Sequence, residues 1–281
     1  MGRTWIRTDG FFCRASLYGA LFFAVLCGSG PVDAAEIAVA AASDLNFAFR
    51  EAAAQFERQT GTHVRLSLGS SGNFFSQIQN GAPFDLFFSA DIRYPQKLEE
   101  SGHAVPGSLY RYATGRIAVW VPARSTLDIA RRGIEALGDP SVRKIAIANP
   151  KHAPYGRAAV AAMEHFNIYE RVKAQLVLGE NVSQAAQFVE SGAADIGIIA
   201  LSLALAPPMK QAGRYREIPL DAYPPLEQGA IIVKQGANQE GARALLDFMQ
   251  GVEGQAIMHR YGFTTRGIAS GSESKEGLPQ R

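Results

Sequence analysis

The sequence predicts an α/β fold, and two observations support that prediction. Short apolar runs of strand length recur along the chain, and amphipathic stretches of helical length lie between them. Strands and helices in alternation are typical of parallel sheets that carry helices on both faces. A chain of 281 residues is long enough for one large domain or two smaller ones, each with its own core.

Eight apolar runs are predicted to form buried strands. They occupy residues 36–42, 63–68, 84–90, 116–121, 144–148, 174–178, 194–200 and 229–233. Amphipathic helices are predicted between them, for example over residues 45–61 and 183–192. Each of these two helices ends at a glycine, a residue that commonly terminates helices.

The first 34 residues resemble a secretory signal peptide. Arg3, Arg7 and Arg14 precede an apolar run, and Val32 and Ala34 occupy the small-residue positions of a cleavage site. That run is too short to span a bilayer, and no later run approaches the roughly 20 apolar residues of a transmembrane helix. The mature protein is therefore expected to be periplasmic, and the polar residues 266–281 are expected to be disordered.

Both cysteines, Cys13 and Cys27, lie in this leader, so the mature chain is predicted to contain neither a disulfide nor a reactive thiol. A lipoprotein with Cys27 as its lipidated first residue is the alternative, and the bulky Leu26 before it disfavours that alternative. The 28 lysines and arginines nearly balance the 26 aspartates and glutamates. Charge therefore gives no reason to expect a nucleic-acid or membrane partner.

Four of the predicted strand-to-helix junctions carry small or polar residues: Ser43-Asp44, Ser70-Ser71-Gly72, residues 149–156 and residues 179–184. Unpaired backbone N–H groups point outward at a helix N-terminus, which therefore suits an anion. In open α/β sheets ligands also bind beyond the carboxyl ends of the strands, so the four junctions are predicted to form one cleft. Helix capping is the alternative role for each of these side chains, and it is the commoner one.

Five segments, in order, are similar to the periplasmic molybdate-binding proteins of ABC importers. They are AASDL, GSSG with QIQNGAPFDLFFSAD, NPKHAPYG, GENVSQ with SGAADIGIIALS, and QGVEGQAIMHRYGF. The resemblance implies the type II periplasmic-binding-protein fold, in which two α/β lobes enclose a central cleft and are joined by two crossing hinge strands. It implies a first lobe of residues 35–115 plus 227–265 and a second lobe of residues 116–226.

By the same resemblance the ligand is molybdate or tungstate, a tetrahedral dianion that only accepts hydrogen bonds. Ser43 and Ser71 match the two hydroxyl ligands of the first lobe, with the backbone N–H groups of Asp44 and Gly72 beside them. The glycines around Ser71 are expected to let the backbone approach the anion closely. Neutral donors held by the fold can offset the desolvation of a buried anion without a salt bridge.

In the second lobe, Tyr155 and Val182 match positions that donate backbone N–H groups. Many relatives carry a further tyrosine where this chain has Ala200. The ring or the hydroxyl of Tyr155 is therefore expected to replace that contact.

Asp44 departs from the resemblance, because relatives often carry a neutral residue there. A dianion repels a nearby carboxylate, so the Asp44 side chain is expected to cap its helix and turn outward. An inward carboxylate would instead accept the proton of HPO₄²⁻, which leaves phosphate binding open as an alternative. Sulfate is a second alternative, since it differs from molybdate mainly in size.

The sequence does not support a catalytic site. The five histidines lie in unrelated contexts, without the nucleophile elbow of a serine hydrolase or the ligand spacing of a zinc site. A periplasmic enzyme is the less favoured class. The expectation is a monomeric binding protein without cofactor or directly bound metal, which holds molybdenum only as the oxyanion and delivers it to an ABC-transporter permease.

Overall fold

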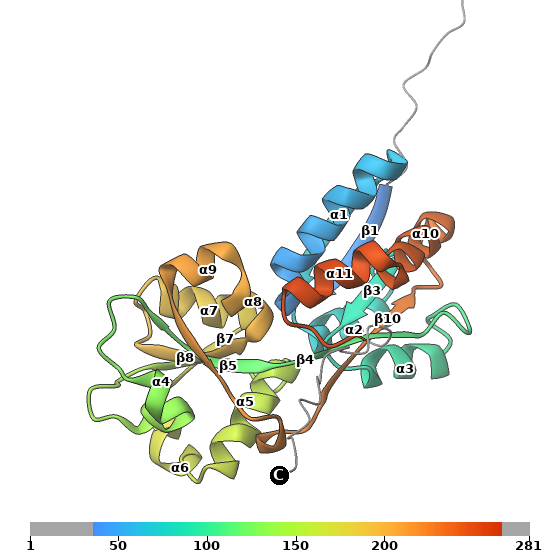
Figure 1. The fold of residues 1–281 in the computed structure, drawn as a ribbon. Helices are drawn as coiled ribbons and strands as arrows, with labels where there is room; N and C mark the ends of the chain where they lie inside the picture. Colours follow the sequence, from blue (N-terminus) through green and yellow to red (C-terminus); the bar gives the residue numbers. More distant parts are fainter. Residues whose placement is uncertain (1–35, 266–281) are drawn as a thin grey trace, which may run out of the picture. The chain divides into compact units, whose positions relative to one another are not determined.

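Two five-stranded sheets organise the chain (Figure 1). The structure, a computed structural model, describes residues 36–265. The predicted signal peptide and the predicted disordered tail lie outside these residues. Within the described residues, no helix combines the length and the apolar character needed to cross a membrane.

The first sheet has the strand order β2-β1-β3-β10-β4. Its strands are β1 (Glu36–Ala42), β2 (His63–Gly69), β3 (Leu86–Ser89), β4 (Tyr110–Gly115) and β10 (Leu226–Ile232). β1 pairs in parallel with β2 and β3, whereas β10 runs antiparallel to β3 and β4.

The second sheet has the order β7-β6-β8-β5-β9. Its strands are β5 (Ile117–Pro122), β6 (Ile145–Ala148), β7 (Leu176–Gly179), β8 (Ile196–Ala200) and β9 (Gly213–Glu217). β6 is parallel to β7 and β8, and β5 is antiparallel to β8 and β9. Both sheets therefore contain the predicted parallel pairs together with antiparallel ones, so each sheet is mixed.

The antiparallel pairs follow from the path of the chain between the sheets. The chain leaves the first sheet after Gly115 and enters the second at Ile117, and it returns between Glu217 and Leu226. β5 and β10, which begin after these crossings, run against their neighbours β8 and β3. These two passages match the predicted pair of crossing strands, and the lobe boundaries stay a prediction.

Helices cover both faces of the first sheet. They are η1 (Ser43–Leu45, 3₁₀), α1 (Asn46–Thr60), α2 (Ser71–Gln79), α3 (Arg93–Glu100), α10 (Gln239–Gln250) and α11 (Val252–Arg260). Successive side chains of β1 point to opposite faces, so Val39 and Ala41 pack with α1, α10 and α11 whereas Ala40 packs with α2 and α3. Figure 1 shows α10 and α11 beside α1, and α2 and α3 across the sheet from them.

The second sheet is covered by two longer helices, α5 and α7, and several short ones. They are α4 (Ile129–Arg132), η2 (Gly133–Gly138), α5 (Pro154–His165), α6 (Tyr169–Val172), η3 (Lys173–Gln175), α7 (Val182–Glu190), α8 (Leu201–Leu205), α9 (Pro207–Ala212) and η4 (Leu220–Ala222). Buried alanines such as Ala159 in α5 and Ala185 in α7 belong to the core of this sheet. Small side chains let both helices lie close to the strands.

The two strands that were not predicted, β4 and β9, are edge strands of their sheets. β9 reads GRYRE and is nowhere fully buried. An edge strand that faces solvent does not need the continuous apolar run by which buried strands are recognised.

Gly156 is required sterically in the first turn of α5. A Cβ on this residue would lie against the carbonyl group of Ala148 and the nitrogen of Pro150, which are backbone atoms. We expect Gly156→Ala to destabilise the protein by about 1–3 kcal/mol, the usual effect of overpacking, measured as a lower midpoint of thermal unfolding. Gly138→Ala is the control, because its Cβ would meet only the end of the Arg171 side chain; equal midpoints for the two variants would contradict the prediction.

Candidate functional site

The four predicted strand-to-helix junctions meet at one small cavity. It encloses about 190 Å³, including its opening to solvent, and its lining residues are Ala42, Ser43, Asp44, Gly69, Ser70, Ser71, Ala90, Ala153, Pro154, Tyr155, Asn181 and Val182. Five of the six predicted site residues lie in this lining, and Gly72 does not. The lining contains no lysine, arginine or histidine.

The serines at the first two junctions do not cap their helices. η1 and α2 begin without a side-chain cap hydrogen bond. Ser43 Oγ instead accepts a 3.3 Å hydrogen bond from the N–H of Ser183, and Ser71 Oγ accepts a 2.9 Å hydrogen bond from the N–H of Ala90. Each hydroxyl oxygen therefore already accepts one backbone N–H, and its own hydrogen is available to a further acceptor.

The capping interpretation holds at the fourth junction. Asn181 accepts a 3.0 Å hydrogen bond from the N–H of Gln184 and so caps α7. Val182 follows as the first residue of α7 and is buried. Val182 lines the cavity, and the N–H of a first-turn residue has no acceptor within its own helix, so its role as a donor to the ligand stays a prediction.

Gly72 has a different role from the one predicted. Its N–H donates a 3.0 Å hydrogen bond to the carbonyl of His152 in the second lobe. A Cβ on Gly72 would come within 2.6 Å of that carbonyl oxygen. Glycine is thus needed here because the backbone of the other lobe approaches closely, and the expectation that this N–H faces the ligand is wrong for this arrangement.

Asp44 points inward, which contradicts the expected outward helix cap. Its side chain is buried, and Oδ2 accepts hydrogen bonds from the Tyr155 hydroxyl at 2.9 Å and from Gln228 Nε2 at 2.8 Å. The Gln228 amide also donates to the Tyr155 oxygen at 3.0 Å. The physical reason is that two buried donors, the Tyr155 hydroxyl and the Gln228 amide, hydrogen-bond the carboxylate in the interior. A carboxylate that capped the helix would have pointed to solvent instead.

The second carboxylate oxygen of Asp44 has no such partner. Oδ1 is buried without a hydrogen bond among the described residues. Burial raises the pKa of Asp44 from 3.8 to about 6, although hydrogen bonds from Gln228, Tyr155 and the nearby backbone favour the ionised form. Asp44 is therefore a buried acid that titrates close to neutral pH.

Tyr155 uses its hydroxyl within the protein. Because the hydroxyl donates to Asp44, the expectation that it replaces an anion contact is not met by this arrangement. Burial, followed by the negative charge of Asp44, raises the pKa of Tyr155 well above its ordinary value. The phenol therefore stays neutral. Tyr155 lies in the first turn of α5 and lines the cavity, and its backbone N–H stays a predicted donor to the ligand.

Several contacts between the lobes involve residues that the sequence analysis did not select. Ser183 Oγ donates to the Ser43 carbonyl at 2.8 Å, and Ser202 Oγ donates to the Asp44 carbonyl at 2.6 Å. Ser70 Oγ donates to the His152 carbonyl at 2.6 Å. The serines of the GENVSQ and GIIALS segments were a signal for the first two contacts.

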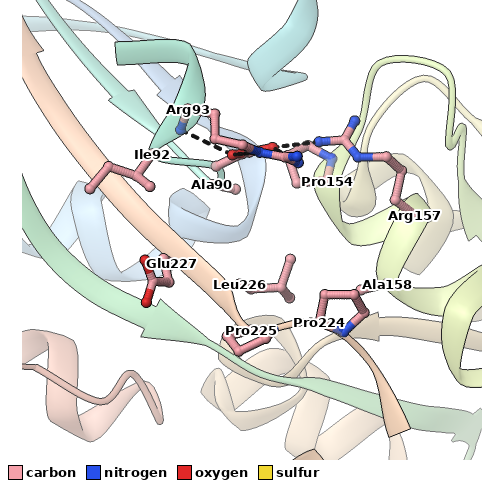
Figure 2. A pocket seen from close by; sticks show the side chains of 11 residues that line it. Ala90, Ile92, Arg93, Pro154, Arg157, Ala158, Pro224, Pro225, Leu226 and Glu227 are labelled. Atoms are coloured by element: carbon pink, nitrogen blue, oxygen red, sulfur yellow. Dashed lines mark hydrogen bonds and ion pairs between the residues drawn. The ribbon is translucent and has the colours of Figure 1, made fainter. Parts of the chain in front are cut away.

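A second, larger cavity adjoins the first and shares Ala90 and Pro154 with it. It encloses about 980 Å³, including its opening to solvent. Figure 2 shows Arg93 and Arg157 converging from opposite sides. Both contact Asp91, at 2.7 Å from each guanidinium to Oδ2.

Asp91 therefore joins the two lobes electrostatically, since Arg157 belongs to α5. Burial opposes ionisation of Asp91, but the hydrogen bonds and charge of Arg93, together with the charge of Arg157, outweigh it and lower its pKa. The carboxylate is thus ionised at neutral pH, and the pair with Arg157 holds the lobes together on this side.

Asp44 should make the stability of the protein depend on pH. Its pKa is higher in the folded state than in the unfolded chain, so the folded protein binds more protons between about pH 4 and pH 6. The free energy of unfolding therefore falls as pH rises through that window. We expect Asp44→Asn, which cannot ionise, to match the wild type near pH 4 and to be more stable by roughly 2–3 kcal/mol at pH 7.5, in thermal unfolding without oxyanions.

Asp85→Asn is the matched control. Both Asp85 oxygens accept backbone N–H groups, from Ala38 and Asn238, so this substitution should lower stability at pH 7.5. A loss of stability in Asp44→Asn at pH 7.5 would show that the carboxylate is stabilising in the folded state, contrary to the prediction.

Comparison with known proteins places the chain in a family. Residues 37–264 match the sequence profile of the family described as bacterial extracellular solute-binding proteins. The molybdate-binding protein ModA of Rhodobacter capsulatus is 37% identical over 248 residues, which are 88% of this chain and 96% of that protein. ModA of Azotobacter vinelandii is 38% identical over 230 residues, covering 82% and 90% of the two chains.

The fold gives the same assignment. The solved structure of the Azotobacter vinelandii periplasmic molybdate-binding protein matches with a TM-score of 0.76 and 35% sequence identity, covering 81% of this chain and 98% of that chain. The predicted type II periplasmic-binding-protein fold is thereby confirmed. The chain belongs to the molybdate-binding proteins among the bacterial extracellular solute-binding proteins.

Proposed function

We propose that this protein captures molybdate, or the similar oxyanion tungstate, and is not an enzyme. The observation that carries the proposal is the state of the Ser43 and Ser71 hydroxyls. Each accepts a backbone N–H and keeps its hydrogen free at a cavity without cations. A fully deprotonated oxyanion has only acceptors, so such donors match it.

The proposed ligand contacts come from both lobes. The first lobe supplies the hydroxyls of Ser43 and Ser71 and the backbone at Asp44. The second supplies the backbone N–H groups of Tyr155 and Val182, at the starts of α5 and α7. Helix starts favour negative charge through their dipoles and unpaired N–H groups, and Gly72 is left out because its N–H is already bonded.

The relatives support this ligand over the alternatives. Proteins 37–38% identical to the chain over most of its length are named for molybdate. The inward Asp44 is the observation that speaks for phosphate, whose remaining proton could be donated to Oδ1. Sulfate differs from molybdate in size rather than in hydrogen bonding, and a catalytic role has no support among the cavity residues.

The proposed biological role is delivery. The chain would be exported by its N-terminal leader, act in the periplasm as a monomer, and present the loaded, closed form to the membrane permease of an ABC transporter. The family to which it belongs and the presence of donors from two lobes at one cavity support this role.

Removal of either hydroxyl should weaken binding. We expect Ser43→Ala and Ser71→Ala each to lose a charge-assisted hydrogen bond of about 1.5–3 kcal/mol, roughly a 10- to 100-fold increase in Kd for molybdate. Isothermal titration calorimetry against molybdate, tungstate, sulfate and phosphate measures this and tests the assignment of the ligand.

Ser76→Ala is the control for these variants. Ser76 lies on the same helix as Ser71, and its hydroxyl donates to the Gly72 carbonyl at 3.2 Å, away from the cavity lining. Its affinity should equal that of the wild type. Unchanged affinity in Ser43→Ala and Ser71→Ala would remove these serines from the site, and tight phosphate binding without molybdate binding would overturn the ligand.

Binding should also close the cleft. Donors of two lobes can reach one ion only when the lobes approach each other, as in hinge closure of binding proteins. Small-angle X-ray scattering should show a smaller radius of gyration with molybdate than without it. Identical curves, combined with tight binding, would argue that the lobes do not move.

A further inference from the structure

The unpaired oxygen of Asp44 creates an electrostatic problem for the proposed ligand. Asp44 lines the cavity, and its side chain is buried. An ionised carboxylate has no hydrogen to donate and repels a dianion, and this repulsion is strong where water is excluded.

No cation offsets the charge of this carboxylate. The groups that face the Asp44 carboxyl are the hydroxyl of Tyr155 from α5, the amide of Gln228 from β10 and the backbone N–H groups of Asp44 and Leu45. The Ser202 hydroxyl from α8 bonds the Asp44 carbonyl. Tyr112 of β4 is the other titratable group close enough to interact with Asp44, and burial keeps it neutral. The carboxyl group is therefore surrounded by neutral groups.

The two carboxylate oxygens of Asp44 differ in their hydrogen bonding. Oδ2 already accepts two hydrogen bonds, whereas Oδ1 accepts none among the described residues. A proton on Oδ1 would leave both bonds to Oδ2 in place. It would also turn Oδ1, which with Gln228 Oε1 is one of two buried side-chain oxygens of the cluster without a hydrogen bond among the described residues, into a donor.

We propose that Asp44 enters the anion complex in its protonated form, with Oδ1 donating a hydrogen bond to the bound oxyanion. This inference rests on the proposed function and deepens it, because it adds a residue that determines which ligands the site accepts. In the binding step, the free protein with ionised Asp44 takes up one oxyanion and one proton from solvent to form the complex. No covalent bond to the anion forms or breaks.

The inference assigns a selectivity to the site. A protonated Asp44 favours oxyanions that carry no proton, because a ligand O–H would face a carboxyl O–H and leave a donor unpaired. The raised pKa of Asp44 makes the proton available near neutral pH. The inward carboxyl group thus becomes compatible with a dianion.

The inference is tested by calorimetry, which measures how many protons the protein takes up when it binds molybdate. Molybdate is titrated into the full-length mature protein at pH 7.5 in buffers of different ionisation enthalpy, and the slope of the binding enthalpy gives the protons taken up. We expect about one proton for the wild type, and a Kd that falls about tenfold for each pH unit from 8.5 to 7.5. Asp44→Asn should bind molybdate with no proton uptake and with a Kd independent of pH, since its amide donates permanently.

Asp195→Asn is the matched control, because that carboxylate accepts the N–H groups of Arg143 and Lys144, and none of these three residues lines the cavity. It should keep the proton uptake of the wild type. Tight molybdate binding by the wild type without proton uptake would overturn the inference and leave the proposed function standing. Proton uptake that persists in Asp44→Asn would overturn it as well, by assigning the proton to another group.

Phosphate binding distinguishes a failure of the proposed function from a failure of Asp44 protonation alone. If the wild type binds phosphate without proton uptake and fails to bind molybdate, Asp44 acts as an acceptor of the ligand's proton. In that case both the proposed function and this inference fail. A thermal-unfolding midpoint of Asp44→Asn at or above that of the wild type confirms that the variant is folded in every arm.

Discussion

The buried hydrogen bonds among Asp44, Tyr155 and Gln228 are the constraint on which the rest of the cleft depends. They join the end of β1, the start of α5 and the returning strand β10, segments up to 184 residues apart in the chain. Buried polar groups need partners; Asp44 and Gln228 pair within the first lobe, whereas Tyr155 finds its partners only when the two lobes are together. Buried hydrogen bonds between the lobes thus stabilise the closed arrangement, in addition to any stabilisation by a bound ligand.

This cluster explains the small residues around it. A Cβ on Gly115, where the chain leaves the first sheet, would lie against the Tyr155 hydroxyl and the Gln228 amide. Gly72 is similarly closed off by the backbone of His152. Both glycines have ordinary negative φ angles, so their role is space for an approaching group rather than backbone freedom. Substitutions there would press on the contact between the lobes before they disturb either core.

The sequence predicted what is local and missed what depends on distant segments. The four junctions that meet at the cavity were predicted because a strand end followed by a helix start is visible in a few adjacent residues. The resemblance to a family, not this pattern, named Ser43, Ser71 and Val182 among them as donors to the ligand. The orientation of Asp44 could not be found in this way, since it is set by Tyr155 and Gln228, and Gln228 lies inside an apolar strand with no motif around it. Edge strands β4 and β9 were missed because partial exposure removes the apolar run that marks a buried strand. The resemblance to a family, rather than the pattern, supplied the two-lobe architecture.

The absence of cations from the small cavity has a consequence for how the cleft responds to ionic strength. Salt largely screens exposed charges that are farther apart than the Debye length, about 8–10 Å at moderate concentration, and the hydroxyl and N–H donors around Ser43 and Ser71 carry no net charge to be screened. The Asp91–Arg157 pair is different, because the Arg157 side chain is 35% exposed. Added salt therefore acts on the partly exposed Asp91–Arg157 pair at the rim of the cleft more than on the uncharged donors inside it, so the two parts of the interface differ in their sensitivity to ionic strength.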